Sequence, residues 1–441
     1  MKILMINSFN YLRGGGERCF FDLSDLLRSH GHEVIPFCMD HPKNLPSEYS
    51  DYFVSYVDFP TELAKPGLSP KLRVVERVLY SREARQKVEA LIDLVNPDLV
   101  HIHGFIHEMS TSILPALKAA GLPVVQTLHD YKPACPNTTF VSNDTICEAC
   151  KGGKYYNMTR YRCKRGSRSA SMLATAEMYF HEVFRLYQPN VDRFIAPSRF
   201  MADKMIEHGI DLPIDVIPNF INPASFTAVY EPENHFVFAG RLVRVKGILT
   251  LLEAMRHIRG DAVLNIAGAG ELEPELRQFV QTHQLTNVRF LGHLDTGELA
   301  RLVQTARFTV SPSEWYENYS MTVIESLASG TAVIGANIGG IPEQVRDGWN
   351  GYLFEPGNAV ELAAKMQALL DDRELAIEMG RNGRAQVEAL NSPETHYDQT
   401  LEVYERMRRE STLSPAVPAR QIRSEGNLAL KLTVGCGQYS L

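Results

Sequence analysis

The sequence predicts an α/β protein with two domains, each a doubly wound parallel sheet, facing each other across a cleft. Three observations support this prediction. The chain has 441 residues, which suits two domains of about 200 residues better than one core. Short apolar runs alternate with segments of helical periodicity in both halves, as in parallel strands joined by crossover helices. A polar, proline-containing stretch at 218–234 reads as a linker.

The first half opens with a strand, a helix with apolar residues at helical spacing, and a second strand. Ser198 stands where it can cap the helix after the last strand of this half. The predicted strands are 3–6, 34–37, 99–102, 124–128 and 193–195. These elements define an N-terminal domain over 1–217.

The second half repeats the alternation and defines a C-terminal domain over 235–392. Its predicted strands are 236–239, 262–266, 288–291, 308–310 and 332–334. A helix over 393–410 closes the folded part, and we expect the tail 411–441 to be poorly ordered. Ligands of doubly wound sheets bind beyond the carboxyl ends of the strands, so the motifs at those ends matter most.

Composition narrows the function classes. Apolar residues make up 44% and charged residues 22%, as in soluble globular proteins. The net charge of -7 and the absence of a reader motif argue against nucleic acid as a partner. The opening apolar run is too short for a signal peptide, and no later run is long enough to span a membrane. We therefore expect a cytoplasmic protein.

The segment 311–325 carries the strongest motif, with Glu317 and Glu325 eight residues apart. A helix beginning near Glu317 would set the two carboxylates about 12 Å apart along its axis. One carboxylate can then bind sugar hydroxyls and the other ribose hydroxyls, with a diphosphate near the helix N-terminus. The alternative is a solvated helix with two surface glutamates.

A second motif follows the first strand of the C-terminal domain, where Gly240 and Arg241 precede Lys246. Fixed cations stabilise the charge that grows on a leaving diphosphate and need no metal to do so. Arg grips two phosphate oxygens, whereas Lys acts as a mobile point charge. Gly268, at the next strand end, lets backbone approach a ligand closely. The alternative is a basic surface loop.

With these motifs the chain resembles the retaining glycosyltransferases of family 4 from Met1 to about Leu401. The resemblance implies the GT-B fold, in which two Rossmann-like domains face each other. It implies that Glu317 contacts the donor sugar and Glu325 the ribose. It also implies that Arg241 and Lys246 bind the diphosphate of a nucleoside-diphosphate sugar.

The loop after Glu317 departs from the family pattern. Where many members have Gly-Phe-Gly, this chain has Asn318, Tyr319 and Ser320. We expect their backbone groups to contact the sugar or phosphate. The departure leaves the donor open between a UDP-sugar and a GDP-sugar, with a weak preference for UDP.

In the first half, Gly14 and Gly15 follow the opening strand, and His103 and the pair His129–Asp130 follow two later strands. The glycine loop lacks the third glycine of the dinucleotide fingerprint. The resemblance places this loop at the acceptor side and makes His129 the active-site histidine, which orients the sugar or the acceptor. His103 and Asp130 are further acceptor-side candidates. A histidine at a strand end can equally be structural.

An insert over 131–168 contains four cysteines within 29 residues: Cys135, Cys147, Cys150 and Cys163. In a cytoplasmic chain this spacing predicts a structural zinc site. Free thiols, or a redox pair at Cys147 and Cys150, are the alternatives.

The segment 151–168 contains seven basic residues and no acidic ones. Such a basic patch can bind a polyprenyl-diphosphate acceptor or an anionic membrane surface. A solvated basic loop is the alternative.

Together these features predict a retaining, metal-independent hexosyltransferase. It would move a sugar from a sugar nucleotide to a glycan or polyprenyl-linked acceptor in cell-surface polysaccharide synthesis, peripherally at the inner face of the membrane. A sugar-nucleotide epimerase or isomerase on the same scaffold is one alternative. A non-catalytic nucleotide-binding scaffold acting through the insert is the other.

Overall fold

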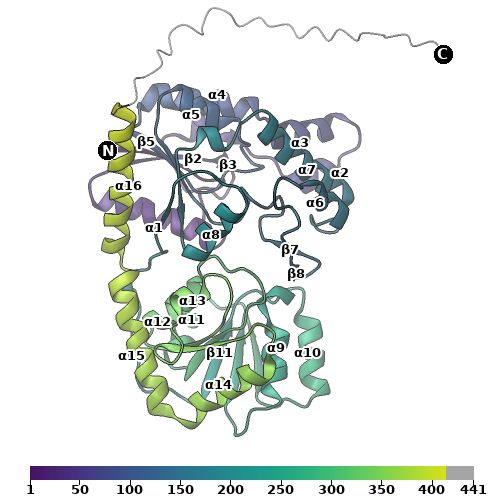
Figure 1. Ribbon diagram of the computed structural model, residues 1–441, viewed down its shortest axis with the longest axis vertical. Helices are drawn as coiled ribbons and strands as arrows, with labels where there is room; N and C mark the ends of the chain where they lie inside the picture. Colours follow the sequence, from purple (N-terminus) through teal and green to yellow (C-terminus); the bar gives the residue numbers. More distant parts are fainter. Residues whose placement is uncertain (414–441) are drawn as a thin grey trace, which may run out of the picture.

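The computed structural model describes residues 1–413 and contains two six-stranded parallel sheets, one in each half of the chain (Figure 1). The N-terminal sheet has the order β10-β9-β6-β5-β1-β2. Its strands are β1 (Lys2–Ile6), β2 (Glu33–Phe37), β5 (Leu99–Ile102), β6 (Val124–Thr127), β9 (Arg193–Ala196) and β10 (Ile214–Val216). The order reverses between β1 and β5, as in doubly wound folds, so the prediction of the fold class is confirmed for this half.

The C-terminal sheet has the order β13-β12-β11-β14-β15-β16, again with all neighbours parallel. Its strands are β11 (His235–Ala239), β12 (Val263–Ala267), β13 (Val288–Gly292), β14 (Phe308–Ser311), β15 (Ala332–Ala336) and β16 (Gly351–Phe354). Strands such as β5 and β15 are buried along their whole length, because helices cover both faces of each sheet. This is why they appear in the sequence as continuous apolar runs.

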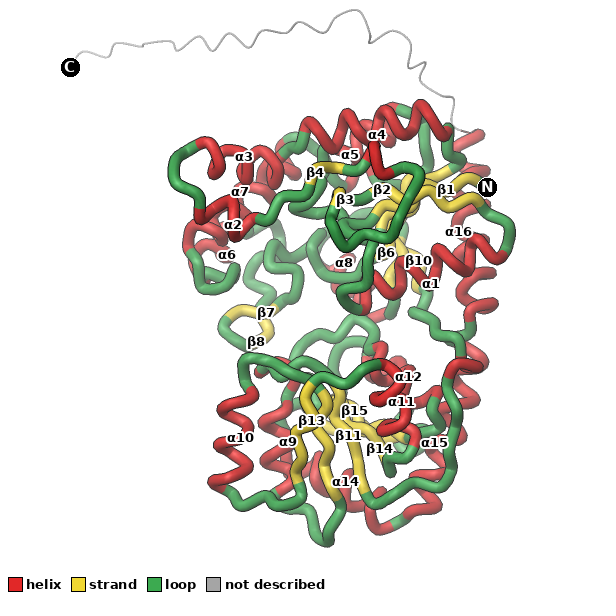
Figure 2. The backbone as a smooth tube through the Cα atoms, turned by 180° about the vertical axis from the view of Figure 1, so that it is seen from behind, coloured by secondary structure: helices red, strands yellow, loops and turns green. Residues whose placement is uncertain are grey.

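Helices lie on both faces of each sheet (Figures 1 and 2). Those of the first half are α1 (Gly15–Ser29), α2 (Phe59–Ala64), α3 (Ser69–Leu79), α4 (Arg82–Val95), α5 (Ile113–Ala119), α6 (Tyr156–Tyr161), α7 (Arg168–Val183) and α8 (Arg199–Glu207). Those of the second are α9 (Ile248–Met255), α10 (Glu273–Thr282), α11 (Thr296–Gln304), α12 (Met321–Ala328), α13 (Ile341–Gln344), α14 (Ala359–Asp371) and α15 (Arg373–Leu390).

The last helix, α16 (Pro393–Leu413), returns to the N-terminal domain and lies along its sheet (Figure 1). Tyr404 is fully buried there, and its hydroxyl lies 2.5 Å from Nδ1 of His101. The helix therefore ties the end of the described chain to the first domain. The predicted tail 411–441 begins inside α16, and its part beyond Leu413 lies outside the described residues.

The insert 131–168 contains a short antiparallel hairpin, β7 (Val141–Ser142) and β8 (Thr145–Ile146), and the helix α6. Both views place this hairpin at the level between the two sheets, close to the C-terminal domain (Figures 1 and 2). A two-stranded parallel pair, β3 (Met39–Asp40) and β4 (Val54–Ser55), lies beside the first sheet. No helix within residues 1–413 combines the length and apolarity needed to cross a bilayer.

Candidate active site

The loop between β14 and α12 carries Glu317, and it ends later than the sequence predicted. Helix α12 begins at Met321, so Glu317 lies in the preceding loop and not on the helix. Buried Gln344 holds both backbone groups of Ser320: its Oε1 accepts the Ser320 N–H at 2.9 Å, and its Nε2 donates to the Ser320 carbonyl at 2.8 Å. This clamp fixes Ser320 in an extended conformation at the helix start. The expected helical spacing of the two glutamates is therefore wrong.

Glu317 is 7% exposed and receives three polar contacts on one carboxylate oxygen, Oε1. Lys246 Nζ lies at 2.5 Å, Ser313 Oγ at 2.7 Å and Trp315 Nε1 at 2.8 Å. Burial would raise the pKa of the Glu317 carboxyl, but the charge of Lys246 and the three hydrogen bonds outweigh it and hold the pKa below its usual value. Glu317 is therefore ionised, and its second oxygen is not used by these contacts.

Lys246 reaches Glu317 because its turn packs directly on the loop 312–320. The turn Arg244–Lys246 ends at Gly247, whose φ is +66°. A Cβ atom at Gly247 would lie 1.7 Å from the carbonyl oxygen of Pro312, so only glycine fits. The sequence placed Lys246 near a diphosphate, but it did not show the ion pair with Glu317.

Gly240 and Gly268 bring two strand ends into contact. Gly268 has a φ of +142°, and a Cβ atom there would lie 1.9 Å from the carbonyl oxygen of Gly240. Their absent side chains thus allow two backbone segments to meet. Arg241, which follows Gly240, has an exposed side chain above the carboxyl end of β11.

The three residues after Glu317 have distinct environments. Asn318 crosses to the other domain, where its Nδ2 donates to the carbonyl oxygen of His129 at 2.5 Å. Tyr319 is 9% exposed and its hydroxyl accepts from Asn391 at 2.8 Å, so its side chain belongs to the domain core. The Ser320 N–H is already taken by Gln344, which leaves Asn318 as the member of the three that faces the first domain.

Glu325 lies on α12 and pairs with Arg18 of α1 across the two domains. Arg18 Nη1 lies 2.5 Å from Glu325 Oε1. Burial raises the pKa of the Glu325 carboxyl, and Arg18 only partly opposes this. Sequence reasoning missed Arg18, although its position just after the glycine loop was a signal. Gly14 caps α1, and Gly15 faces Met321 of the second domain.

His103, which is buried, and His129, which is half-buried, form a pair at the carboxyl ends of β5 and β6. His103 Nδ1 lies 2.8 Å from His129 Nε2, and their rings stack with centroids 5.0 Å apart. Burial lowers the pKa of His129 to about 4 and that of His103 well below its usual value, so both rings are neutral at pH 7. Asp130 is exposed, and its carboxylate accepts the backbone N–H of Lys132 at 2.8 Å.

A cavity of about 280 Å³ opens beside this pair and is lined by residues including Asn7, Ser8, Arg13, Glu108 and His129. Glu108 was not singled out from the sequence. Its Oε2 accepts from Ser8 Oγ at 3.3 Å, and burial raises its pKa to about 7. The cavity thus offers both hydrogen-bond donors and hydrogen-bond acceptors next to the histidine pair.

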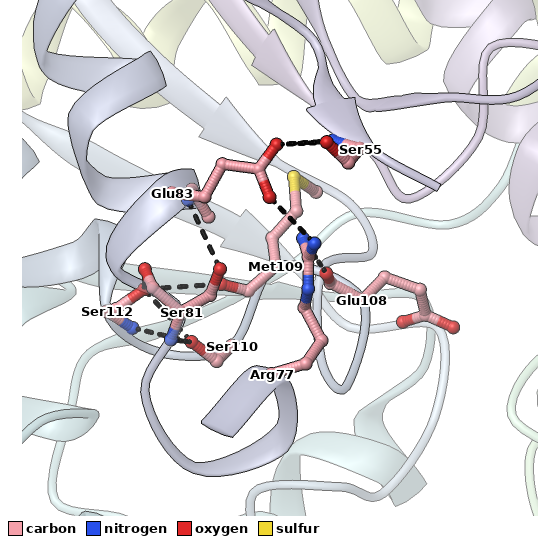
Figure 3. A network of polar contacts seen from close by, with 9 residues as sticks. Ser55, Arg77, Ser81, Glu83, Glu108, Met109, Ser110 and Ser112 are labelled. Atoms are coloured by element: carbon pink, nitrogen blue, oxygen red, sulfur yellow. Dashed lines mark hydrogen bonds and ion pairs between the residues drawn. The ribbon is translucent and has the colours of Figure 1, made fainter. Parts of the chain in front are cut away.

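The loop that forms one wall of this cavity is fixed by a polar network (Figure 3). Arg77 donates to Glu83 at 2.8 Å and to the Glu108 carbonyl at 3.4 Å. Ser112 Oγ donates to the Ser81 carbonyl at 2.7 Å. Figure 3 shows the Glu108 carboxylate pointing away from this network, so the network holds the backbone and leaves the carboxylate for the cavity.

The histidine pKa values give the fold a pH dependence. The pKa of His129 is about 4 in the folded chain and about 6.5 when unfolded, and burial acts similarly on His101 (about 3) and His396 (about 4). Between pH 6.5 and 4 the unfolded chain therefore binds protons that the folded chain does not. We expect the unfolding free energy to be fully present above pH 6.5 and to fall as the pH drops through this window.

Urea unfolding at pH 7, 6 and 5 measures the slope of the unfolding free energy against pH. His129→Asn should make it shallower by about one proton, because that side chain no longer titrates in the unfolded chain. Identical slopes for the two proteins would contradict neutral burial of His129.

The four cysteines of the insert form no disulfide. Within residues 1–413, no group of three or more His, Cys, Asp or Glu side chains is arranged to hold a metal ion. Burial, and then the neighbouring Cys135, Cys163 and Cys147, raise the pKa of the Cys150 thiol to about 12. Cys163 Sγ lies 3.5 Å from Ser142 Oγ. The zinc site expected at Cys135, Cys147, Cys150 and Cys163 stays a prediction.

Two family models match consecutive parts of the chain. The model described as Glycosyltransferase Family 4 matches residues 13–225, and the model described as Glycosyl transferases group 1 matches residues 224–386. The first covers the N-terminal sheet with its histidine pair. The second covers the loop 312–320, Lys246 and both glutamates.

Curated relatives of the chain are also glycosyltransferases or glycogen synthases. An uncharacterized glycosyltransferase of Methanocaldococcus jannaschii is 30% identical over 302 residues, which cover 67% of this chain and 71% of that protein. The chain spans about half the length of several other curated relatives, such as the glycogen synthase of Mycobacterium tuberculosis, of which 54% is covered at 32% identity over 48% of this chain.

The structure of sucrose-phosphate synthase from Thermosynechococcus elongatus has a TM-score of 0.65 at 20% identity and covers 93% of this chain and 99% of its own. Anabaena HepE in complex with UDP and glucose has a TM-score of 0.64 at 17% identity, with coverages of 92% and 100%. At these identities the likeness concerns the fold, which is GT-B. Together with the two family models and the archaeal relative, it shows that this chain belongs to the GT-B glycosyltransferases.

Proposed function

We propose that the protein is a retaining glycosyltransferase that moves a sugar from a nucleoside-diphosphate sugar to a glycan or lipid-linked acceptor. The contact of Lys246 with Glu317 supports this most strongly. It places a cation for a diphosphate beside an ionised, buried carboxylate that has one oxygen left for sugar hydroxyls.

The residues divide the work between the two domains. Lys246 and Arg241 bind the diphosphate, Glu317 the sugar and Glu325 the ribose. During transfer the bond between the sugar C1 and the phosphate oxygen breaks, and its electron pair leaves with the nucleoside diphosphate. The acceptor hydroxyl attacks C1 from the same face and gives its proton to the donor phosphate. Neutral His129 orients the sugar or acceptor, and its low pKa suits a hydrogen-bonding group better than a cation.

For the nucleoside of the donor we propose uridine. The structures of HepE contain UDP, or UDP-glucose, and that protein has the same fold. For the acceptor we propose the cavity beside His129, whose Ser8, Arg13 and Glu108 match the hydroxyl and phosphate groups of a glycan or polyprenyl-linked sugar. Such an acceptor fits a role in cell-surface polysaccharide synthesis.

We propose further that the basic segment 151–168 binds anionic lipid. Six of its seven cations are exposed: Lys151, Lys154, Arg160, Arg162, Arg165 and Arg168. Each cation near an anionic surface contributes about 1 kcal/mol, so R160E/R162E/R165E should lower binding to phosphatidylglycerol vesicles by about 10²-fold or more. A vesicle flotation assay measures this binding, and R256E/R259E/R373E in the other domain is the charge-matched control. Equal binding of both triple variants would exclude this surface.

The transferase proposal is tested by incubating the protein with UDP- and GDP-sugars and measuring release of the nucleoside diphosphate, with and without polyprenyl-linked acceptors. We expect release from one sugar nucleotide, with the configuration at C1 retained in the product. An epimer of the donor in place of a released diphosphate would favour an epimerase and contradict the proposal.

A further inference from the structure

The cysteine-rich insert contacts the loop 312–320 of the other domain, here the donor loop, through a hydrogen bond to Glu148. Tyr316, which directly precedes Glu317, donates its hydroxyl to Glu148 Oε1 at 2.8 Å. Glu148 lies between Cys147 and Cys150, at the end of the β7–β8 hairpin. The hairpin turn makes a second contact across the domains, with Asp144 Oδ2 3.7 Å from Arg244 Nε. The insert thus contacts both the turn that carries Lys246 and the loop that carries Glu317.

Glu148 is itself held firmly by the first domain. Lys204 Nζ donates to its Oε1 at 2.9 Å, and His208 Nε2 lies 3.2 Å from its Oε2. Burial would raise the pKa of the Glu148 carboxyl, but the hydrogen bonds from Lys204, Tyr316 and His208 lower it to about 2. Glu148 is consequently a fixed anion at every physiological pH.

Tyr316 is seated in the first domain although it belongs to the second. Its ring packs against the core of the N-terminal domain. Phe200 meets it edge to face with centroids 5.0 Å apart, and Lys204 Nζ lies 5.2 Å from its centroid. The adjacent Trp315 donates to Glu317, so the position of Tyr316 bears directly on the geometry at Glu317.

We infer that Glu148 is a positioning residue for the donor site: by holding Tyr316, the insert fixes the loop that carries Glu317 when the two domains are together. The inference rests on the proposed function of Glu317 as a donor-sugar ligand. Glu148 does not contact the substrate. It acts through Tyr316, and its effect is on turnover and not on affinity for the nucleotide, which Lys246 and Glu325 bind from the second domain.

Trp315 supplies a readout that does not depend on activity. The chain has two tryptophans, so Trp349→Phe leaves Trp315 as the sole reporter of the donor loop. In that background Tyr316→Phe removes a single hydroxyl and leaves Glu148 paired with Lys204 and His208. We expect it to raise acrylamide quenching of Trp315 about twofold, because a loosened loop exposes a partly buried ring. Glu148→Ala should act the same way.

Glu207→Ala is the matched control, because Glu207 also pairs with Lys204, at 3.0 Å, but lies on the surface. It should leave Trp315 quenching unchanged. In the same proteins, Tyr316→Phe and Glu148→Ala should each lower kcat for hydrolysis of UDP-glucose or GDP-mannose about tenfold, as expected for a lost hydrogen bond to a charged group. The dissociation constant for UDP or GDP should stay unchanged. The kcat of the double variant should be no lower than that of either single variant.

Quenching and kcat in Tyr316→Phe and Glu148→Ala equal to those of Glu207→Ala would overturn the inference, even if turnover by the parent protein confirmed the proposed function. An additive double variant would overturn it too, because the two residues would then act separately. If the parent protein turned over no sugar nucleotide, the proposed function would fail, and Trp315 quenching would still decide whether Glu148 holds the loop.

Discussion

Replacing Lys246 with alanine is expected to lower kcat/KM for the sugar nucleotide by about 10²- to 10³-fold, the range for loss of one charge-stabilising group in an active site. The ammonium group lies 2.5 Å from Glu317 and faces the region assigned to the diphosphate. Its removal takes away a cation that opposes charge on the leaving group. Steady-state release of nucleoside diphosphate measures the effect.

The same substitution leaves Glu317 buried without its cation. The charge of Lys246 opposes the rise in the pKa of Glu317 that burial would cause, so we expect this pKa to be higher in Lys246→Ala. The variant should therefore lose activity, as the pH is lowered, at a pH where the parent protein is still active. Arg256→Ala, which removes an exposed cation from the same domain, is the control. A variant at Lys246 that keeps the parent kcat/KM would refute its role at the diphosphate.

Replacing His129 with alanine is expected to lower kcat by about 10²-fold, the cost of a misplaced reacting group. His129 lies against His103 at 2.8 Å, and its backbone carbonyl receives Asn318 from the donor loop. The carbonyl contact survives in the variant, so affinity for the nucleotide should not change. Single-turnover kinetics with the active sugar nucleotide separate these two quantities.

His283→Ala, an exposed histidine in the other domain, is the control for His129. A rise in KM with kcat unchanged would show that His129 serves only ground-state binding. In that case the histidine pair would be a structural feature of the strand ends.

The parallel sheets could be predicted because buried strands leave apolar runs in the sequence. The prediction missed β10 (Ile214–Val216) and β16 (Gly351–Phe354), which are short, partly exposed and contain polar or small residues. Local signals also marked Glu317, Glu325, Lys246 and His129 as candidates, since each lies in the loop, turn or helix that follows a strand. Those signals report position along the chain and not partners.

The contacts that join the domains could not be predicted. Arg18 and Glu325 are 307 residues apart, and Tyr316 and Glu148 are 168 apart, so no local pattern links them. The start of α12 was misplaced because Gln344, from another helix, holds Ser320 outside the helix. In each case tertiary contacts overrode the local pattern.

The proposed function requires that Lys246 and Glu325 belong to one nucleotide site. A thermal-shift titration with UDP, GDP, ADP and CMP tests it most directly, with Lys246→Ala and Glu325→Ala measured alongside. We predict that one nucleoside diphosphate, UDP, raises the melting temperature of the parent protein with increasing concentration, and that both variants lose this shift. Stabilisation by none of the four, or an undiminished shift in both variants, would contradict the assignment of the donor site.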